Sequence, residues 1–283
     1  MRIISRMLKR ALMGILNSDE ISQLYSSFDI VGDVAIIKIP DRLIDKKDII
    51  AKAILDNLKS VKTVLRQASP ISGTYRTREL EYLMGEKKTL TFYREHGCTF
   101  KVDLAKVYFS PRLSYERLRV AEQVNPNERV VNMFGGVGTF SILIAKKHPS
   151  VTVYNIDINP DAHLLAVENA IINKVSDRVI CILGDSRKVI HEMLVGIADR
   201  VLMPLPEKAC EYLDVAIEAL KPQGGIIHYY TEVHGSRVTD VIQEAESQLH
   251  KSLTVPHRIR FSRVVREVGP RWSQIVLDVE VWK

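Results

Sequence analysis

Short apolar runs alternate with segments of helical periodicity from residue 114 to the C-terminus. The segments between the runs carry apolar residues on one helical face, as helices that cover a sheet do. Strands and helices in this alternation predict an α/β fold with a doubly wound, mostly parallel sheet. A final antiparallel hairpin is also expected. The predicted strands are 129–131, 151–156, 179–183, 198–203 and 224–230, and the hairpin strands are 259–265 and 275–282.

The first hundred residues follow a different pattern, without regular alternation of strands and helices. We therefore expect two domains: a small α+β module over residues 1–105 and a Rossmann-like domain over residues 106–283. The elements expected in the module are a helix over 1–20 closed by the polar cluster 17–19, strands on either side of Gly32-Asp33, a lysine-lined helix over 45–60, a strand over 61–65, and strands on either side of His96-Gly97.

A glycine-rich turn follows the first strand of the alternating region. It reads Gly-Gly-Val-Gly over 135–138, and an apolar helix and a second strand, which ends on Asp157, come next. A strand, glycine loop, helix, strand and acid in this order hold a nucleoside at the carboxyl edge of a parallel sheet. The dinucleotide fingerprint fails because Phe140 stands where its third glycine would be. The turn therefore favours a smaller nucleoside, S-adenosylmethionine (AdoMet), over the alternative of a turn with no ligand.

Two carboxylates, Asp157 and Asp185, come directly after successive strands. The carboxyl ends of parallel strands lie at one edge of the sheet, where ligands bind. In an AdoMet site the first carboxylate would bind the ribose hydroxyls and the second the adenine amino group. Either could instead cap a helix, since Asp is a favoured N-cap residue. Two such residues beside one glycine turn make a joint capping role the weaker explanation.

The sequence Pro204-Leu205-Pro206 stands at the end of the fourth strand. Two prolines around one residue stiffen a loop and remove two backbone donors. Methyltransferases that act on nitrogen often carry an Asx-Pro-Pro-aromatic loop at this place. A stiff turn without a catalytic role explains the spacing equally well.

Composition limits the class of protein and its partners. With 283 residues, 46% hydrophobic and 26% charged, the chain can bury a substantial core. A formal charge of +6 and a pI near 9.1 favour a polyanionic partner. No apolar run approaches the ~20 residues of a membrane span. Cys98, Cys181 and Cys210 lack disulfide or metal-site spacing, so a reducing cytoplasm and no metal are expected. We expect a monomer.

Several motifs together resemble one family, the archaeal and eukaryotic tRNA guanine-N1 methyltransferases and their relatives of the wyosine pathway. The resemblance covers almost the whole chain. It implies an AdoMet-dependent tRNA methyltransferase with a class I Rossmann-like sheet and a small N-terminal RNA-contacting domain. The target it implies is the purine 3′ of the anticodon. The motifs lie at 25–40, 108–117, 132–142, 156–160 and 203–206.

The resemblance also implies roles for single residues. Glu116 would be the general base, and Arg76 would contact the target base or stabilise developing charge. Without the resemblance, Glu116 could belong to a salt-bridged helix start and Arg76 could be a solvated charge. The flipped base would stack on Tyr108 or Phe109. The implied catalytic residues are Glu116, Arg76, Pro204 and Pro206; the implied cofactor residues are Phe109, Arg117, Phe134, Gly136, Gly138, Asp157, Ile158, Asp185 and Ser186; the implied substrate residues are Arg76, Tyr108 and Arg112.

Two departures from the family pattern change the expected substrate. The resemblance implies that full-length relatives begin with an extra domain that grips the outer corner of tRNA, and we expect this protein to lack that domain. Recognition is then expected to rest on the anticodon stem-loop of tRNA-Phe and on the basic module.

The second departure is Pro204, which stands where guanine-N1 enzymes carry Asn. Proline offers no side-chain donor or acceptor to a purine edge. This favours the branch that methylates 4-demethylwyosine at C7 to give isowyosine. The alternatives are guanine-N1 methylation, alone or as a second activity, aminocarboxypropyl transfer to the same base, and a non-catalytic tRNA-binding module.

Overall fold

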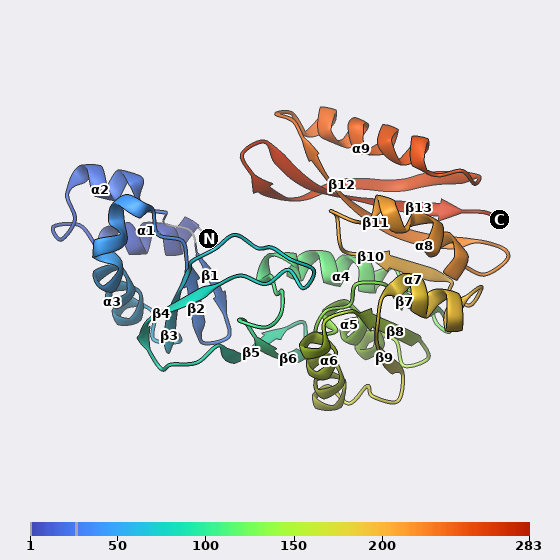
Figure 1. Ribbon diagram of the computed structural model, residues 1–283, viewed down its shortest axis with the longest axis horizontal. Coiled ribbons are helices and arrows are strands. Elements are labelled where there is room, and N and C mark those ends of the chain that lie inside the picture. The colour runs from blue at the N-terminus through green and yellow to red at the C-terminus, as the bar shows by residue number, and fades with distance from the viewer. Residues whose placement is uncertain (1, 26–27) are drawn as a thin grey trace. The chain divides into compact units, whose positions relative to one another are not determined.

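The computed structural model describes residues 2–25 and 28–283, and the chain divides into two compact units (Figure 1). The first unit comprises Met1–Glu95 and Thr99–Pro111, and the second comprises His96–Cys98 and Arg112–Lys283. The chain therefore passes between the units more than once around residues 95–112. The boundary expected after residue 105 lies within this stretch and stays a prediction.

The second unit contains a seven-stranded sheet in the order β12-β13-β11-β10-β7-β8-β9. Neighbouring strands from β11 to β9 are parallel, whereas β13 is antiparallel to both β11 and β12. The predicted sheet and its final hairpin are confirmed, and the order is that of a class I methyltransferase. The strands are β7 (Arg129–Asn132), β8 (Thr152–Asp157), β9 (Val179–Leu183), β10 (Arg200–Met203), β11 (Gly225–His234), β12 (His257–Gly269) and β13 (Trp272–Val281).

The strand order reverses between β7 and β10. From β7 the chain proceeds outward to β8 and β9, while β10 and β11 extend the sheet the other way. Helices that leave in opposite directions open a crevice at such a point, on the carboxyl side of the strands. The end of β7 and the end of β10 thus flank the place where a ligand is expected.

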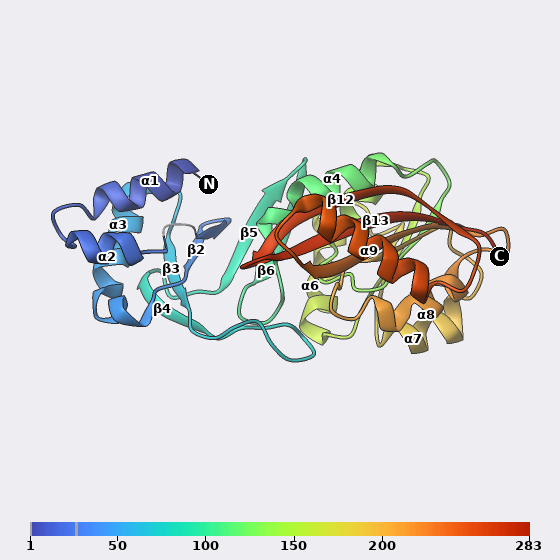
Figure 2. The same cartoon turned by 90° about the horizontal axis from the view of Figure 1, so that it is seen from above.

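Helices cover both faces of this sheet, and Figure 2 shows α4 on one side with α7 and α8 on the other. Local sequence sets their starts: Pro160 is the first residue of α6, and Asn159 caps it. A 3-10 turn precedes α8. The segments are η2 (Pro111–Leu113), α4 (Ser114–Glu122), α5 (Thr139–Lys147), α6 (Pro160–Ile172), α7 (Ser186–Val189), the π-helical η3 (Ile190–Leu194), the 3-10 helix η4 (Cys210–Tyr212), α8 (Leu213–Ala219) and α9 (Val238–Ser252).

Alternate residues of the central strands face different surroundings. On β11, Ile227, Tyr229 and Val233 join the apolar cluster formed with α7, α8 and α9. The residues between them, His228 and Tyr230, are also fully buried but point to the opposite face. One face of the sheet is therefore an ordinary apolar core, and the other has polar and ionisable groups within it.

The first unit combines helices with a four-stranded sheet in the order β1-β2-β3-β4. The predicted hairpin at Gly32-Asp33 is present, as is the two-residue turn at His96-Gly97. The helix expected over 1–20 was wrong in extent: two helices form, and Asn17 caps the second through a capping box with Glu20. The elements are α1 (Arg2–Ala11), α2 (Ser18–Gln23), β1 (Asp29–Val31), β2 (Val34–Ile37), the 3-10 helix η1 (Asp41–Lys46), α3 (Lys47–Asn57), β3 (Thr63–Gln67), β4 (Leu80–Gly85) and the separate ribbon of β5 (Leu90–Glu95) and β6 (Cys98–Asp103).

The helices of the first unit pack on one face of its sheet through aliphatic side chains. Leu8 of α1, Leu12 just after α1, Ile50 and Ile54 of α3, and Ile37 of β2 are fully buried in one cluster. This unit therefore has a core of its own. Across the described residues, none of the helices is long and apolar enough to cross a membrane.

Candidate active site

The glycine turn after β7 takes a shape that side chains would block. A Cβ on Gly135 would lie 2.2 Å from the amide oxygen of Asn155, and Gly138 has a φ of +85°. Gly136 also has a positive φ, +53°, but a Cβ there would meet nothing within 4 Å. Gly135 and Gly138 are thus required by packing and backbone conformation. Gly136 borders open space, where a ligand can approach the backbone.

Buried amide and hydroxyl groups support this turn from below. Asn132 Nδ2 donates to Ser141 Oγ at 3.1 Å, and Ser141 donates to Asn155 Oδ1 at 2.6 Å. Asn132 and Asn155 are neighbours across β7 and β8. The Oδ1 atom of Asn132 is buried without a hydrogen-bond partner within the described residues. An unsatisfied buried acceptor at the carboxyl end of β7 suits a ligand that carries a donor, such as an ammonium group.

Asp157 is held by backbone amides from two sides. Its Oδ2 accepts from the Gly136 N–H at 2.6 Å, and its Oδ1 accepts from the Asn159 N–H at 2.9 Å. Burial raises the pKa of the carboxyl, and these backbone hydrogen bonds act in the opposite direction. Asn159, and not Asp157, caps α6. The capping alternative therefore fails for Asp157, which ties the glycine turn to the end of β8.

Asp185 does cap a helix, and it has a second partner. Its Oδ1 accepts from the Arg187 N–H at 2.8 Å at the start of α7, and its Oδ2 accepts from the Tyr212 hydroxyl at 2.9 Å. Tyr212 in turn packs edge-on against Phe134, with ring centroids 5.2 Å apart. Ser186 donates to the backbone carbonyl of Met133. The structure thus brings Phe134, Asp185 and Ser186 together, with a tyrosine that sequence analysis did not identify.

Glu116 lies elsewhere, in α4, and its side chain is only 1% exposed. Its Oε1 accepts from Arg119 Nη2 at 2.7 Å and from the Tyr230 hydroxyl at 2.8 Å. Its Oε2 accepts from Arg119 Nε at 3.0 Å and from Arg263 Nη2 at 2.8 Å. Four donor atoms therefore surround this carboxylate, so Glu116 does belong to a salt-bridged helix start, and its role as general base stays a prediction.

The ion pairs continue from Glu116 across the sheet. Asp278 Oδ2 accepts from Arg119 Nη1 at 2.5 Å, and its Oδ1 lies 2.6 Å from His228 Nδ1. Arg200 Nη1 lies 2.8 Å from His228 Nε2, and Arg200 Nε donates to Glu128 at 2.7 Å. We call this set the Glu116 network: Glu116, Arg119, Tyr230, Arg263, Asp278, His228, Arg200 and Glu128.

The partners of His228 determine its tautomer. An arginine guanidinium has only donors, so Nε2 of His228 must accept from Arg200 and the ring proton must sit on Nδ1, where it is donated to Asp278. Burial lowers the pKa of His228, against the opposing effect of Asp278. Burial raises the pKa of Asp278, but His228 and Arg119 outweigh it and hold that pKa well below its usual range. The imidazole is therefore neutral, and the six ionic members, three arginines and three carboxylates, balance in charge.

The other predicted residues of the second unit differ in exposure. Arg117 is buried in α4, Arg112 is exposed in η2, and Ile158 is 41% exposed just after Asp157. Pro204 and Pro206 are half-buried and follow β10 directly. The two prolines thus stand at the reversal point of the sheet, on the same edge as the glycine turn.

Three predicted residues belong to the first unit. The Arg76 guanidinium lies over the Tyr108 ring at 4.9 Å, and Arg76 has a positive φ of 54°. Phe109 is buried, edge-on to Tyr93 at 5.1 Å. Arg76 and Tyr108, the two residues expected to meet the target base, therefore lie against one another. No group of three or more His, Cys, Asp or Glu side chains in the described part of the chain could hold a metal ion.

Comparison with known protein families matches both parts of the chain. The model of the TRM5/TYW2 methyltransferase domain matches residues 91–260, and that of the TYW2 N-terminal domain matches residues 8–89. The chain is 43% identical over 258 residues to tRNA (guanine(37)-N(1))-methyltransferase Trm5b of Pyrococcus abyssi, covering 91% of this chain and 76% of the relative. It is 39% identical over 262 residues to tRNA 4-demethylwyosine(37)-methyltransferase Taw21 of Saccharolobus solfataricus. This match covers 91% of this chain and 94% of the relative.

Solved structures share this fold and carry the expected ligands. The structure of aTrm5 in complex with tRNALeu superposes with a TM-score of 0.85 at 34% identity, covering 97% of this chain and 78% of that one. The structure of P. horikoshii TYW2 in complex with MeSAdo superposes with a TM-score of 0.79 at 30% identity. This match covers 99% of this chain and 100% of that one. With the glycine turn, the two carboxylates and the sheet order, these matches show that the chain belongs to the TRM5/TYW2 methyltransferase family and is an AdoMet-dependent enzyme of the tRNA methyltransferase class.

Proposed function

We propose that the chain methylates position 37 of tRNA-Phe, the purine 3′ of the anticodon, at C7 of 4-demethylwyosine to give isowyosine. The observation that carries the choice of base is Pro204, which replaces the Asn of the guanine-N1 enzymes at the end of β10. The similarity to Taw21 over 91% of this chain supports the same choice.

The chemistry of the loop explains why Pro204 would change the substrate. An asparagine at this place offers one donor group and one acceptor to the polar edge of guanine, whereas proline offers neither. The tricyclic base is flatter, less polar at that edge and already alkylated at N1. The loop is also stiff, because two prolines fix φ on either side of Leu205, whose carbonyl accepts from the Lys208 N–H at 3.1 Å.

The cofactor would be held by the edge of the sheet described above. Asp157 and Asp185 would accept from its ribose hydroxyls and adenine amino group, and the orphaned Asn132 Oδ1 would accept from its ammonium. Phe134 and Ile158 would flank the adenine. AdoMet supplies an activated methyl carbon on a positively charged sulfur, which leaves as a neutral thioether.

We assign Glu116 as the group that takes the proton. C7 forms the new carbon–carbon bond and loses its hydrogen as a proton, and a carboxylate oxygen accepts it. The four donor atoms that bond to Glu116 stabilise its charged form and so oppose uptake of the proton. One of these donors must therefore move away from the carboxylate first. Arg263 is the partner to do so, because its side chain is 29% exposed whereas that of Arg119 is 11% exposed.

Recognition of the RNA would involve the first unit and the start of α4. Tyr108 would stack on the flipped base, and Arg76 and Arg112 would contact the base or its phosphates. Stacking on an aromatic side chain is worth ~1–3 kcal/mol per base. Replacing Tyr108 by alanine should therefore raise the Michaelis constant for tRNA more than that for AdoMet.

The test is nucleoside mass spectrometry after incubation with AdoMet and either of two tRNA-Phe substrates. One carries guanosine at position 37 and the other 4-demethylwyosine. We expect a methyl group on the tricyclic base alone, and Pro204→Asn should transfer activity toward guanosine. Pro204→Ala is the matched control, because it restores the same backbone N–H as Pro204→Asn but adds no side-chain donor or acceptor. Methylation of guanosine alone by the unaltered enzyme would contradict the proposal.

The second candidate is methylation of guanine at N1, and the 43% identity to Trm5b favours it. Methyl groups on both substrates would make the enzyme bifunctional. A mass gain equal to an aminocarboxypropyl group would instead identify the transferase activity named for a relative from Methanocaldococcus jannaschii, which is 40% identical over 198 residues.

A further inference from the structure

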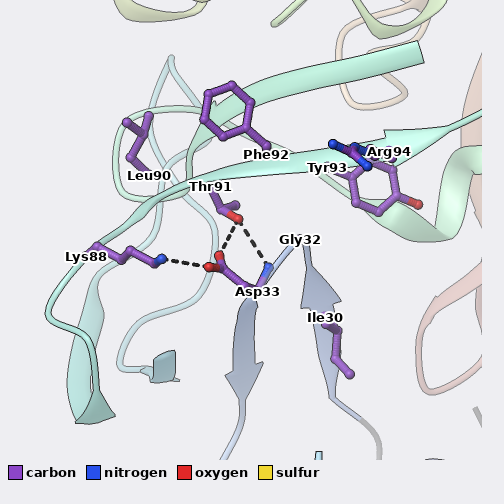
Figure 3. Close-up of a pocket in the computed structure, with 9 residues that line it drawn as sticks. All are labelled: Ile30, Gly32, Asp33, Lys88, Leu90, Thr91, Phe92, Tyr93 and Arg94. Carbon is purple, nitrogen blue, oxygen red and sulfur yellow. Dashed lines mark hydrogen bonds and ion pairs between the residues drawn. The ribbon is translucent and has the colours of Figure 1, made fainter. Parts of the chain in front are cut away.

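A cavity of about 600 Å³ lies in the first unit, between the β1–β2 turn and β5 (Figure 3). Its lining includes Asp33, Lys88, Phe92 and Arg94. We call it the β5 groove. None of its lining residues has a role in the cofactor edge or in the Glu116 network, so the proposed chemistry leaves the groove unexplained.

Close packing fixes the inner wall of the groove. A Cβ on Gly32 would lie 2.4 Å from the Phe92 carbonyl oxygen, so the turn meets the β5 backbone directly. Asp33 Oδ1 accepts from the Thr91 hydroxyl at 2.7 Å, and Asp33 Oδ2 accepts from Lys88 at 2.7 Å. Burial raises the pKa of Asp33, but the bonds from Lys88 and Thr91 outweigh it and lower that pKa below its ordinary value. The acid is therefore ionised, and it shares Lys88 with Glu86, whose Oε2 lies 2.7 Å from the ammonium.

The outer wall presents an aromatic ring and cations. Leu90, Phe92 and Arg94 alternate along β5 with the inward-facing Thr91, and Figure 3 shows Phe92 on the opposite side of the strand from Thr91. Phe92 is 53% exposed, so its ring is open to solvent on the face of β5 that points away from Asp33 (Figure 3).

The ribbon register places a second cation beside Phe92. His96 and Gly97 both have positive φ, 46° and 76°, as a two-residue type I′ turn requires, and the Leu104 N–H donates to the Thr89 carbonyl in the same register. That register sets Lys101 opposite Phe92, on the same face of the ribbon. Phe92 thus lies between Arg94 along the strand and Lys101 across it.

Charge is distributed unevenly along the chain. Residues 1–111 contain 19 Lys and Arg against 13 Asp and Glu, and residues 112–283 contain 21 of each. The whole formal excess of +6 therefore falls on the part of the chain that contains the groove. An exposed aromatic ring flanked by cations on a β-ribbon is the arrangement by which proteins hold unpaired nucleotides.

We propose that the outer face of β5, at the rim of the β5 groove, binds one unpaired nucleotide of the RNA substrate, outside the base that is methylated. The base stacks on Phe92, and Arg94 and Lys101 contact the flanking phosphates. The choice of RNA as the ligand rests on the proposed function, and the assignment of the groove rests on the contacts above. This second anchor would hold a loop nucleotide on the first unit, independently of the stacking proposed for Tyr108.

The test uses the full chain and anticodon stem-loop RNAs that each carry 2-aminopurine at a different loop position. Stacking quenches the fluorescence of this base. In the unaltered protein, we expect quenching that depends on Phe92 at one position other than 37. Phe92→Ala should abolish that signal and weaken RNA binding about 5- to 150-fold, the range that loss of one stacked base implies. Phe92→Tyr should retain both.

Two further variants separate stacking from charge and from general damage. Arg94→Gln should reduce the slope of log Kd against log salt by about 1, with the 2-aminopurine signal preserved. Tyr82→Ala removes another exposed aromatic of the same unit, on β4 and outside the groove, and should change neither readout. Folding of each variant is checked by thermal unfolding, and AdoMet affinity should stay constant throughout.

The outcomes distinguish this proposal from the proposed function. If Phe92→Ala leaves affinity and every fluorescence signal unchanged, the groove proposal is overturned, whether or not methyl is transferred. A loss of affinity with Arg94→Gln but not with Phe92→Ala would also overturn it, since the surface would then act by charge alone. Phe92-dependent quenching in a protein that transfers no methyl would support the groove and overturn the proposed activity.

Discussion

Asp157 and Glu116 are both acids that follow from the same family resemblance, yet the structure holds them in different ways. Asp157 accepts from two backbone N–H groups that lie within 21 residues of it in sequence. Glu116 accepts from three side chains, of which Tyr230 and Arg263 lie 114 and 147 residues away. The first carboxylate is positioned by the local backbone, and the second by the tertiary fold.

This difference bears on what each carboxylate can do. Backbone amides fix Asp157 at modest cost and leave lone pairs for a ligand, because a carboxylate has about four acceptor sites. Glu116 is buried, and its charge is compensated chiefly by Arg119, which donates to both of its oxygens and is itself nearly buried. We infer that changes at the cofactor edge act mainly on binding, and that changes in the network act on both folding and catalysis.

The largest effect is expected from Glu116→Gln. Removing this charge leaves the nearly buried Arg119 without one of its two carboxylates, and breaking a buried ion pair costs about 3–5 kcal/mol of unfolding free energy. Methyl transfer should be lost as well if Glu116 takes the proton. Urea denaturation and single-turnover kinetics would measure the two effects. Glu122→Gln is the matched control, because Glu122 is an exposed acid at the end of the same helix.

If the Glu116→Gln protein had an unchanged unfolding free energy, the groups of the Glu116 network would not stabilise one another. If it were stable and still active, the carboxylate would have neither role, and the contrast with Asp157 would disappear.

A smaller and more selective effect is expected from Asp157→Asn. The amide presents an NH2 group to one of the two backbone donors, so one hydrogen bond is lost and a ribose contact weakens. Loss of a charge-assisted hydrogen bond costs about 1.5–3 kcal/mol, which corresponds to a roughly 10- to 150-fold increase in the AdoMet Kd. Calorimetric titration with AdoMet would measure it. RNA affinity should stay unchanged, and a parallel loss of RNA binding would contradict a role confined to the cofactor.

The same contrast explains how much could be predicted from the sequence. The strands of the sheet, the glycine turn and the position of Asp157 after its strand follow from local patterns, because strand periodicity and turn glycines act over a few residues. Asn17 shows the limit of that approach: it was expected to close the first helix, and it begins the second because Glu20 completes a capping box.

The Glu116 network could not be predicted in full for a physical reason. Arg119 is three residues from Glu116, and helical spacing alone would have paired them. Asp278 and Arg263 meet this helix, and His228 meets Asp278, only because β11, β12 and β13 pair in one register. Polar residues inside apolar strands, such as His228 and Asp278, were the available signal. They indicate a buried polar partner without identifying it.

A dependence on pH would test whether His228 is neutral, as its two partners require. Its pKa is lowered in the folded protein, so as pH falls below ~6.5 the unfolded state binds a proton that the folded state does not. Stability should therefore decrease as pH is lowered from 6.5, by at most about 1.4 kcal/mol per pH unit. Urea denaturation between pH 7.5 and 5 would measure the slope. His228→Gln should be less stable at pH 7.5, but its unfolding free energy should change less steeply with pH. An unchanged slope of unfolding free energy against pH would assign the dependence to another histidine.

The smallest effect is expected from Arg263→Gln, and it tests which partner releases Glu116. The Arg263 side chain is partly exposed and also lies over the Tyr115 ring at 4.8 Å, so it can leave the carboxylate without being stranded in the core. An ion pair at the surface is worth about 0.2–1 kcal/mol, so unfolding free energy should fall by no more than this. Methyl transfer should stay within about threefold, which is under 1 kcal/mol in activation free energy. Arg119→Gln is the comparison, because Arg119 bridges Glu116 and Asp278 and its loss leaves both acids uncompensated. The opposite result would be loss of methyl transfer in Arg263→Gln with transfer preserved in Arg119→Gln. Arg263 would then be the cation that keeps Glu116 in place, and another partner would have to leave the carboxylate when the proton is taken.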